Sequence, residues 1–196
     1  MHKRLVLGLA CLLTTFVVMG CGEPPRKEMD QAQGAIDAAR AARADVYAVT
    51  EYVAATEALK NADEAAAARD FRLALSNALE SREFAQNAAR VSADTQAKAR
   101  ADVERSTEDI TALMAHAKTG LTAARSARVA TRVLFEPAAA IEVAVKALQE
   151  SGEAMATGDY LAATEALTGV RARLDKAVTT IDAARQPPPR LTRPRK

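Results

Sequence analysis

Alanine accounts for 47 of the 196 residues, and this composition restricts the chain to few kinds of fold. Alanine is the strongest helix former because it loses no side-chain entropy in a helix. It also buries little apolar area, so an alanine core stabilises a fold through many small contacts between closely packed helices. Between Pro25 and Pro187 the only proline is Pro137, and sustained apolar–polar alternation is absent. We therefore predict an all-α fold built from long helices.

The first 21 residues contain the most apolar stretch of the chain. A basic start at residues 2–4 precedes an apolar run from Leu5 to Val18, and Gly20 precedes Cys21. This order is typical of a secretory signal peptide, residues 1–20, with cleavage between Gly20 and Cys21. The run of about 15 residues is shorter than the roughly 20 residues of a membrane-spanning helix, which disfavours an uncleaved anchor.

Residues 18–21, Val-Met-Gly-Cys, resemble the lipobox of bacterial lipoproteins. The resemblance implies that the Cys21 thiol receives a diacylglycerol and that its new amino group receives an acyl chain such as palmitate. Gly22 stands where an Asp retains enterobacterial lipoproteins in the inner membrane. This difference favours the inner leaflet of the outer membrane, with the protein facing the periplasm of the cell envelope. A plain signal peptide, which would leave a soluble protein with a free Cys21 thiol, remains the alternative.

Charge argues against a nucleic-acid-binding protein, and cysteine content argues against a disulfide. Lys3 and Arg4 lie in the predicted leader, which leaves 25 of the 27 basic residues against 25 acidic ones. Residues 186–196 carry four basic residues and no acid, so the rest of the chain beyond the leader is slightly acidic. It therefore lacks the excess of basic residues that is typical of a nucleic-acid-binding surface. Because Cys11 lies in the leader and Cys21 is the expected lipid site, we predict no disulfide.

Apolar residues spaced three and four apart predict four helices. We expect the first from Lys27 to about Ala68, the second from an Asp70 cap to Gly120, the third over residues 121–157 and the fourth over 160–185. A kink or restart is expected at Pro137. The expected buried rows include Val46, Val49 and Val53 in the first helix, Ser106 in the second, and Tyr160, Ala163, Leu167, Val170, Leu174, Ala177, Ile181 and Ala184 in the fourth.

An internal repeat relates the two halves of the body. Asp70-Phe71 recurs as Asp159-Tyr160, and Ala74 and Ala88 recur as alanines, all at a spacing of 89 residues; Tyr47 recurs as Phe135 at 88. The repeat predicts two helical hairpins, residues 27–118 and 119–185, which form either an antiparallel four-helix bundle or an elongated coiled-coil-like rod. Residues 21–26 are a short tether, and residues 186–196 are a Pro-rich basic tail.

The pattern Ala-Leu, then Asp-Phe or Asp-Tyr, then Ala covers most of residues 35–184. It resembles an uncharacterised family of outer-membrane lipoproteins with Ala-rich helical hairpins. This resemblance implies an envelope location and brings no catalytic residues.

Chemically reactive side chains are sparse. His116 is the one histidine beyond the leader and has no His or Glu at metal-ligand spacing. Asp63-Glu64 and Glu108-Asp109 are typical of a solvated helix face rather than of a pair of catalytic acids. We predict no enzyme activity, no metal and no cofactor. The aromatic residues fit the packing of bundle ends better than a binding groove: Tyr47, Tyr52, Phe71, Phe84, Phe135 and Tyr160.

The tail ends in Arg195-Lys196, which is similar to the end of Braun's murein lipoprotein, whose terminal lysine is joined to peptidoglycan. The simpler interpretation is a basic tail in which Arg190, Arg193, Arg195 and Lys196 contact cell-wall carboxylates or anionic lipid by charge.

These observations favour a membrane-anchored structural or adaptor scaffold of the envelope. Its partner would be an envelope protein, peptidoglycan or a second copy of the chain. One alternative is a ligand- or peptide-binding bundle with a cavity lined by Ile110, Leu113, Leu134 and Ile141. The other is an anchor joined to the cell wall through Lys196.

Overall fold

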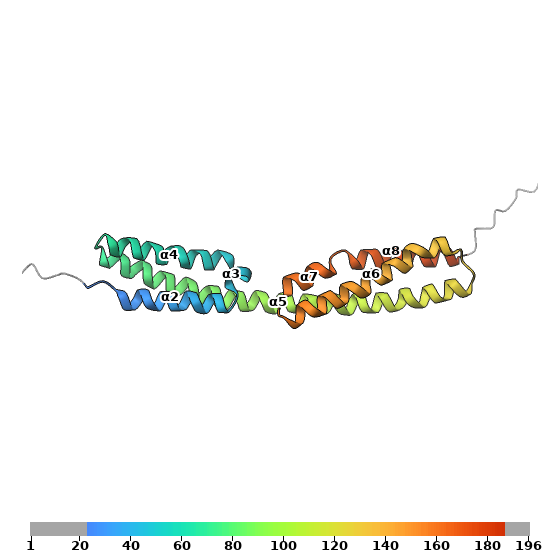
Figure 1. Cartoon of the computed structure of the whole chain (residues 1–196), viewed down its shortest axis with the longest axis horizontal. Helices are drawn as coiled ribbons and strands as arrows, with labels where there is room; N and C mark the ends of the chain where they lie inside the picture. Colours follow the sequence, from blue (N-terminus) through green and yellow to red (C-terminus); the bar gives the residue numbers. More distant parts are fainter. Residues whose placement is uncertain (1–22, 187–196) are drawn as a thin grey trace, which may run out of the picture. The chain divides into compact units, whose positions relative to one another are not determined.

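The computed structural model describes residues 23–186 (Figure 1). Over this range the chain is helical with short interruptions and contains no strand, which confirms the all-α prediction. The chain divides into two compact units, of which the described residues are 23–94 in unit 1 and 95–186 in unit 2. The long helix α5 (Phe71–Ser126) contributes its first part to unit 1 and its remainder to unit 2.

Unit 1 contains α2 (Arg26–Ala41), the single turn α3 (Ala44–Tyr47), α4 (Val49–Ala67) and the first part of α5. α4 returns along α2, and α5 then returns along α4 (Figure 1). Small residues dominate the core, whose main cluster is Ile36, Ala39, Ala44, Ala48, Tyr52, Ala55, Ala85 and Ala88. Two buried serines also connect α5 to its neighbours: Ser81 donates to the Ala55 carbonyl at 2.8 Å, and Ser92 to the Ala42 carbonyl at 2.7 Å.

Unit 2 contains the second part of α5 with α6 (Thr131–Ala156), α7 (Tyr160–Leu167) and α8 (Val170–Arg185). α6 packs against both α7 and α8 (Figure 1). Its core has more branched aliphatic side chains than that of unit 1: Val103, Ile110, Leu121, Leu134, Ile141, Leu167, Val170, Leu174 and Ile181, with alanines between them. Each unit is therefore a helical bundle of three antiparallel segments.

The two units repeat one three-segment pattern of burial. Along the second and third segments, buried positions of unit 1 recur as buried positions 89 residues later: Ala48/Pro137, Tyr52/Ile141, Ala55/Ala144, Ala58/Ala147, Ala62/Ser151, Ala74/Ala163, Ala78/Leu167, Ser81/Val170, Ala85/Leu174, Ala88/Ala177 and Ser92/Ile181. The repeating element is therefore larger than the predicted two-helix hairpin.

The first segments repeat at a different spacing. Ala32, Ile36 and Ala39 of α2 correspond to Ala117, Leu121 and Ala124 of α5, 85 residues later, and all six are buried. Each segment closes at an arginine in the left-handed conformation, Arg43 (φ 59°) or Arg128 (φ 60°). Unit 2 thus has four more residues between its first two segments. The expected hairpin limits, 27–118 and 119–185, do not coincide with the division after Asp94.

The predicted first helix is wrong as one continuous element. It is interrupted at Ala42–Arg43, where Arg43 is left-handed, and again at Ala48 (φ −144°). Each interruption rotates the next helix, so the buried face moves to Tyr47, Ala48 and Tyr52. As a consequence, the row expected to be buried is exposed: Val46, Val49 and Val53.

Two further predicted boundaries are also wrong. α5 continues through Gly120 to Ser126, and the break expected at Pro137 lies at residues 127–130, with Pro137 buried inside α6. Gly120 does not end the helix. It allows close packing instead, because a Cβ at this position would lie 3.2 Å from Ile181 Cγ2. Ser106, expected in the buried row of α5, is exposed.

The predicted fourth helix is divided into α7 and α8 by Thr168 and Gly169, the latter with φ 74°. The interruption preserves the phase of the apolar row, since Ala163, Leu167, Val170, Leu174, Ala177 and Ile181 are all buried.

The predicted Asp70 cap is confirmed, and Asp159, which occupies the equivalent position in the repeat, is a cap as well. Asp70 accepts a hydrogen bond from the Leu73 N–H at 3.0 Å, and Asp159 accepts one from the Ala162 N–H at 3.2 Å. Each carboxylate satisfies a backbone donor that has no partner within its helix. The residue before each Asp is left-handed, namely Arg69 (φ 63°) and Gly158 (φ 73°).

Candidate functional site

The residues predicted to carry lipid or to touch the cell wall lie outside the described range. Gly20 and Cys21 precede it, and Arg190, Arg193, Arg195 and Lys196 follow it. The assignments of these residues therefore stay predictions from the sequence.

The polar side chains considered for chemistry lie on exposed helix faces. His116 is exposed on α5, and residues 23–186 contain no group of three His, Cys, Asp or Glu side chains that could hold a metal ion. Glu64 pairs with Lys60 at 3.7 Å, while Asp109 of α5 pairs with Arg171 of α8. Such exposed pairs contribute little stability individually.

Arg100 forms a surface ion pair that changes its acidity. Its Nε donates to Glu104 Oε1 at 2.8 Å, and this hydrogen bond, followed by the charge of Glu104, raises the pKa of the guanidinium. The pair is an exposed i,i+4 contact on α5, and Arg100 is charged at neutral pH in either case. The shift therefore indicates a surface helix pair and no reactive centre.

The aromatic residues divide between packing and exposure. Tyr52 is buried, and its hydroxyl accepts a 2.8 Å hydrogen bond from Arg40 Nε. Tyr47 is 6% exposed, with the Arg43 guanidinium 5.3 Å from its ring centre. Phe135 is 68% exposed, so its predicted equivalence to Tyr47 is wrong. The 89-residue spacing instead places Glu136 at the position of Tyr47.

The four side chains that would line a cavity in the ligand-binding alternative pack in the core of unit 2. Ile110, Leu134 and Ile141 are buried in the core cluster of unit 2, and Leu113 packs against that cluster. These four side chains hold α5 and α6 together in unit 2.

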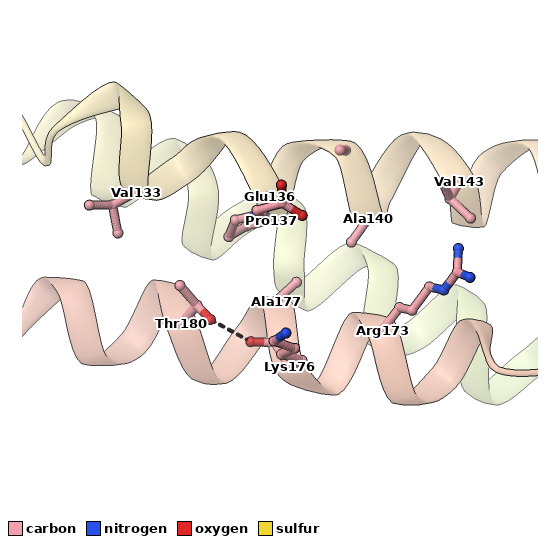
Figure 2. Close-up of a pocket in the computed structure, with 10 residues that line it drawn as sticks. Val133, Glu136, Pro137, Ala140, Val143, Arg173, Lys176, Ala177 and Thr180 are labelled. Carbon is pink, nitrogen blue, oxygen red and sulfur yellow. Dashed lines mark hydrogen bonds between the residues drawn. The ribbon is translucent and has the colours of Figure 1, made fainter.

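A groove instead lies on the surface of unit 2 between α6 and α8 (Figure 2). It has a volume of about 540 Å³. α6 supplies an apolar wall with one acid, and α8 supplies two cations with small residues: Val133, Glu136, Pro137, Ala139, Ala140 and Val143 from α6, and Arg173, Lys176, Ala177 and Thr180 from α8. In Figure 2 the Arg173 side chain rises from α8 toward Val143.

The groove has no aromatic filling, in contrast to the counterpart positions of unit 1. There Phe84 takes the place of Arg173, and Tyr47 takes the place of Glu136. Tyr47 is buried, and Phe84 packs against the core cluster of unit 1. These two differences, Phe84 against Arg173 and Tyr47 against Glu136, become visible when the sequence is aligned with itself at a spacing of 89 residues. The predicted repeat depends on positions where the two copies carry the same or similar residues, and the positions of Phe84 and Arg173 are not among them.

Comparison of the chain with protein-family models, curated proteins and solved structures finds no match. Among the described helices, none combines the length and the apolar character required to cross a membrane.

Proposed function

We propose that this protein is a lipid-anchored structural or adaptor scaffold of the bacterial cell envelope. The proposal depends mainly on the segment Val18-Met19-Gly20-Cys21 at the end of an apolar leader. An acyl chain adds about 0.8 kcal/mol of membrane affinity per buried CH₂, so the two or three chains of such an anchor hold far better than one.

The body of the chain supports a role in presenting helical surface to a partner. Its two units have their own cores and expose long polar helix faces, and its titratable side chains form surface pairs. Helix faces of this kind can be recognised by an envelope protein, by peptidoglycan or by a second copy of the chain.

The anchor is tested by feeding cells an alkyne analogue of palmitate and following the label on the full chain. We expect labelling of the wild type, loss of the label in Cys21→Ser, and retention in the nearby control Gly22→Ala. The wild type should fractionate with the outer membrane. Labelled protein from Cys21→Ser cells, or unlabelled wild-type protein in the soluble fraction, would contradict the anchor.

The adaptor role is tested by cross-linking intact envelopes and identifying the linked peptides by mass spectrometry. We expect reproducible cross-links from exposed lysines of the bundle to one partner, to peptidoglycan fragments or to a second copy. Release of the wall with muramidase distinguishes the cell-wall anchor, in which Lys196 carries a peptidoglycan fragment. An acylated protein without any cross-linked partner would retain the anchor and overturn the adaptor.

A further inference from the structure

We propose that the α6–α8 groove of unit 2 binds a long-chain fatty acid. Its carboxylate would lie against Arg173 and Lys176, and its hydrocarbon chain would lie along α6 toward Val133. This binding site is independent of the scaffold proposal, since it depends only on residues within unit 2.

The wall of the groove suits a single hydrocarbon chain. Val133, Pro137, Ala140 and Val143 follow one another along α6 over ten residues, or about 15 Å at the helical rise of 1.5 Å per residue. Ala177 of α8 completes the apolar surface opposite them (Figure 2). Pro137 and Ala177 are already buried, whereas Val133 and Val143 are exposed and Ala140 is half-buried. Covering these last three side chains would remove apolar area from water, which is the main driving force for binding a chain.

The charges of the groove suit an anionic head group. Arg173 and Lys176 are one helical turn apart on α8, and neither forms an ion pair with another residue of the range 23–186. A guanidinium binds a carboxylate through two parallel hydrogen bonds. Glu136 is the one acid of the lining and would repel a carboxylate, so the head group is expected at the Arg173 end, near Val143.

The size of the groove favours a small ligand over a protein partner. Its volume of about 540 Å³ lies within the range of roughly 300–1,000 Å³ that is typical of small-molecule sites. A stable protein interface buries about 800 Å² on each partner, which requires a broader surface than the few residues of this lining.

Unit 1 shows how the same arrangement looks when it is closed. The counterpart of Arg173 is Phe84, the counterpart of Lys176 is Asn87, and the counterpart of Glu136 is the buried Tyr47. Unit 1 therefore lacks both the cations and the open apolar wall, and it serves as an internal control.

The test uses the full chain in non-ionic detergent with a palmitate analogue that carries a diazirine at its methyl end. After illumination, the labelled residues are located by mass spectrometry. We expect label on α6 between Val133 and Ala140, and none on the counterpart residues 44–51 of unit 1. Unlabelled palmitate should displace the probe, whereas an amine of the same length should not.

Three double variants separate the effect of the groove cations, the effect of the open groove and the effect of net charge on labelling. Arg173→Gln with Lys176→Gln should lower labelling about tenfold because the charged hydrogen bonds are lost. Glu136→Tyr with Arg173→Phe, which copies unit 1, should abolish it. Lys98→Gln with Lys118→Gln removes the same charge from exposed positions of α5 and should leave labelling unchanged. Circular dichroism verifies the helical fold of each variant.

Label spread over both units, equal labelling by the amine, or a charge variant that labels like the wild type would overturn the proposal. A lysophosphatidylcholine probe that labels α6 better than palmitate would also overturn it, since its head group has no net charge.

Discussion

Single buried side chains differ in how well their polar atoms are satisfied. Ser81 and Ser92 donate across helices to backbone carbonyls, whereas the buried Ser151 hydroxyl has no hydrogen-bond partner among residues 23–186. The counterpart of Ser151 in unit 1 is Ala62, which fills the same position without a polar group. A buried hydroxyl without a partner costs free energy, while a satisfied one stabilises modestly.

We therefore predict that Ser151→Ala raises the free energy of unfolding, by up to about 1 kcal/mol. The matched change Ser81→Ala should lower it by about 1 kcal/mol, because the hydrogen bond to Ala55 is lost. Urea unfolding followed by circular dichroism measures both. Equal effects of the two changes would contradict this difference between the serines.

Arginines in the left-handed conformation are a second feature of single residues. Arg69 has φ 63° in the turn before Asp70, where unit 2 has Gly158 at the counterpart position. A side chain in this conformation costs about 1–2 kcal/mol that glycine avoids.

Arg69→Gly should therefore stabilise the protein by about 1 kcal/mol, since part of the gain is offset by the freedom of glycine in the unfolded chain. Gly158→Ala, the opposite change in the equivalent turn, should destabilise it by a similar amount. Thermal unfolding of both variants, with Arg72→Ala as a control at an ordinary helical position, measures the effect. A lower melting temperature for Arg69→Gly would refute this interpretation.

At the scale of the element, glycine has different effects in α6 and at the α7–α8 break. Gly152 lies inside α6 with open space at its Cβ position, whereas Gly169 has φ 74° and separates α7 from α8. Gly169 corresponds to Glu80 of the uninterrupted α5, so the break distinguishes the third segment of unit 2 from that of unit 1.

Gly152→Ala is expected to stabilise the protein by about 0.5–1 kcal/mol through helix propensity. Gly169→Ala is expected to destabilise it by about 1–2 kcal/mol, because alanine is strained at this φ. Neither new methyl group meets a neighbouring atom, so the contrast isolates backbone conformation. Chemical denaturation checks both values, and stabilisation by Gly169→Ala would show that α7 and α8 can merge into one helix.

The helices could be predicted where a short-range sequence pattern marks their ends or their buried face. The Asp caps at Asp70 and Asp159 and the buried row of α8 follow from short-range patterns. The breaks at Arg43 and Arg128 do not, because arginine gives no local indication of a left-handed conformation. Residues 38–43 and 123–128, Ala-Ala-Arg-Ala-Ala-Arg and Ala-Ala-Arg-Ser-Ala-Arg, repeat at these ends, and only comparison of the two copies singles them out.

At the scale of the molecule, two units with separate cores account for the burial of the described residues. Leu174 is completely buried in unit 2, and its counterpart in unit 1 is Ala85. Unit 2 thus depends on large aliphatic side chains where unit 1 depends on small residues and inter-helix hydrogen bonds.

Leu174→Ala should cost about 2–5 kcal/mol through lost burial and the resulting cavity. Hydrogen exchange should show the largest loss of protection in α6 and α8, with α2 and α4 of unit 1 affected less. Leu161→Ala, at an exposed leucine of α7, is the control and should change little. An equal loss of protection in α2 and α4 would show that the two units unfold as one.

The helical class, the two Asp-capped turns and the existence of a repeat follow from the amino-acid sequence alone, because alanine content, caps and apolar spacing act over a few residues. Three features depend on the packing of the helices: the three-segment form of each unit, the exposure of Val46, Val49 and Val53, and the open groove beside Arg173. These features depend on where a left-handed residue changes the direction of the chain and on which side chain fills the space between two packed helices. Both are settled only by contacts between residues far apart in the chain.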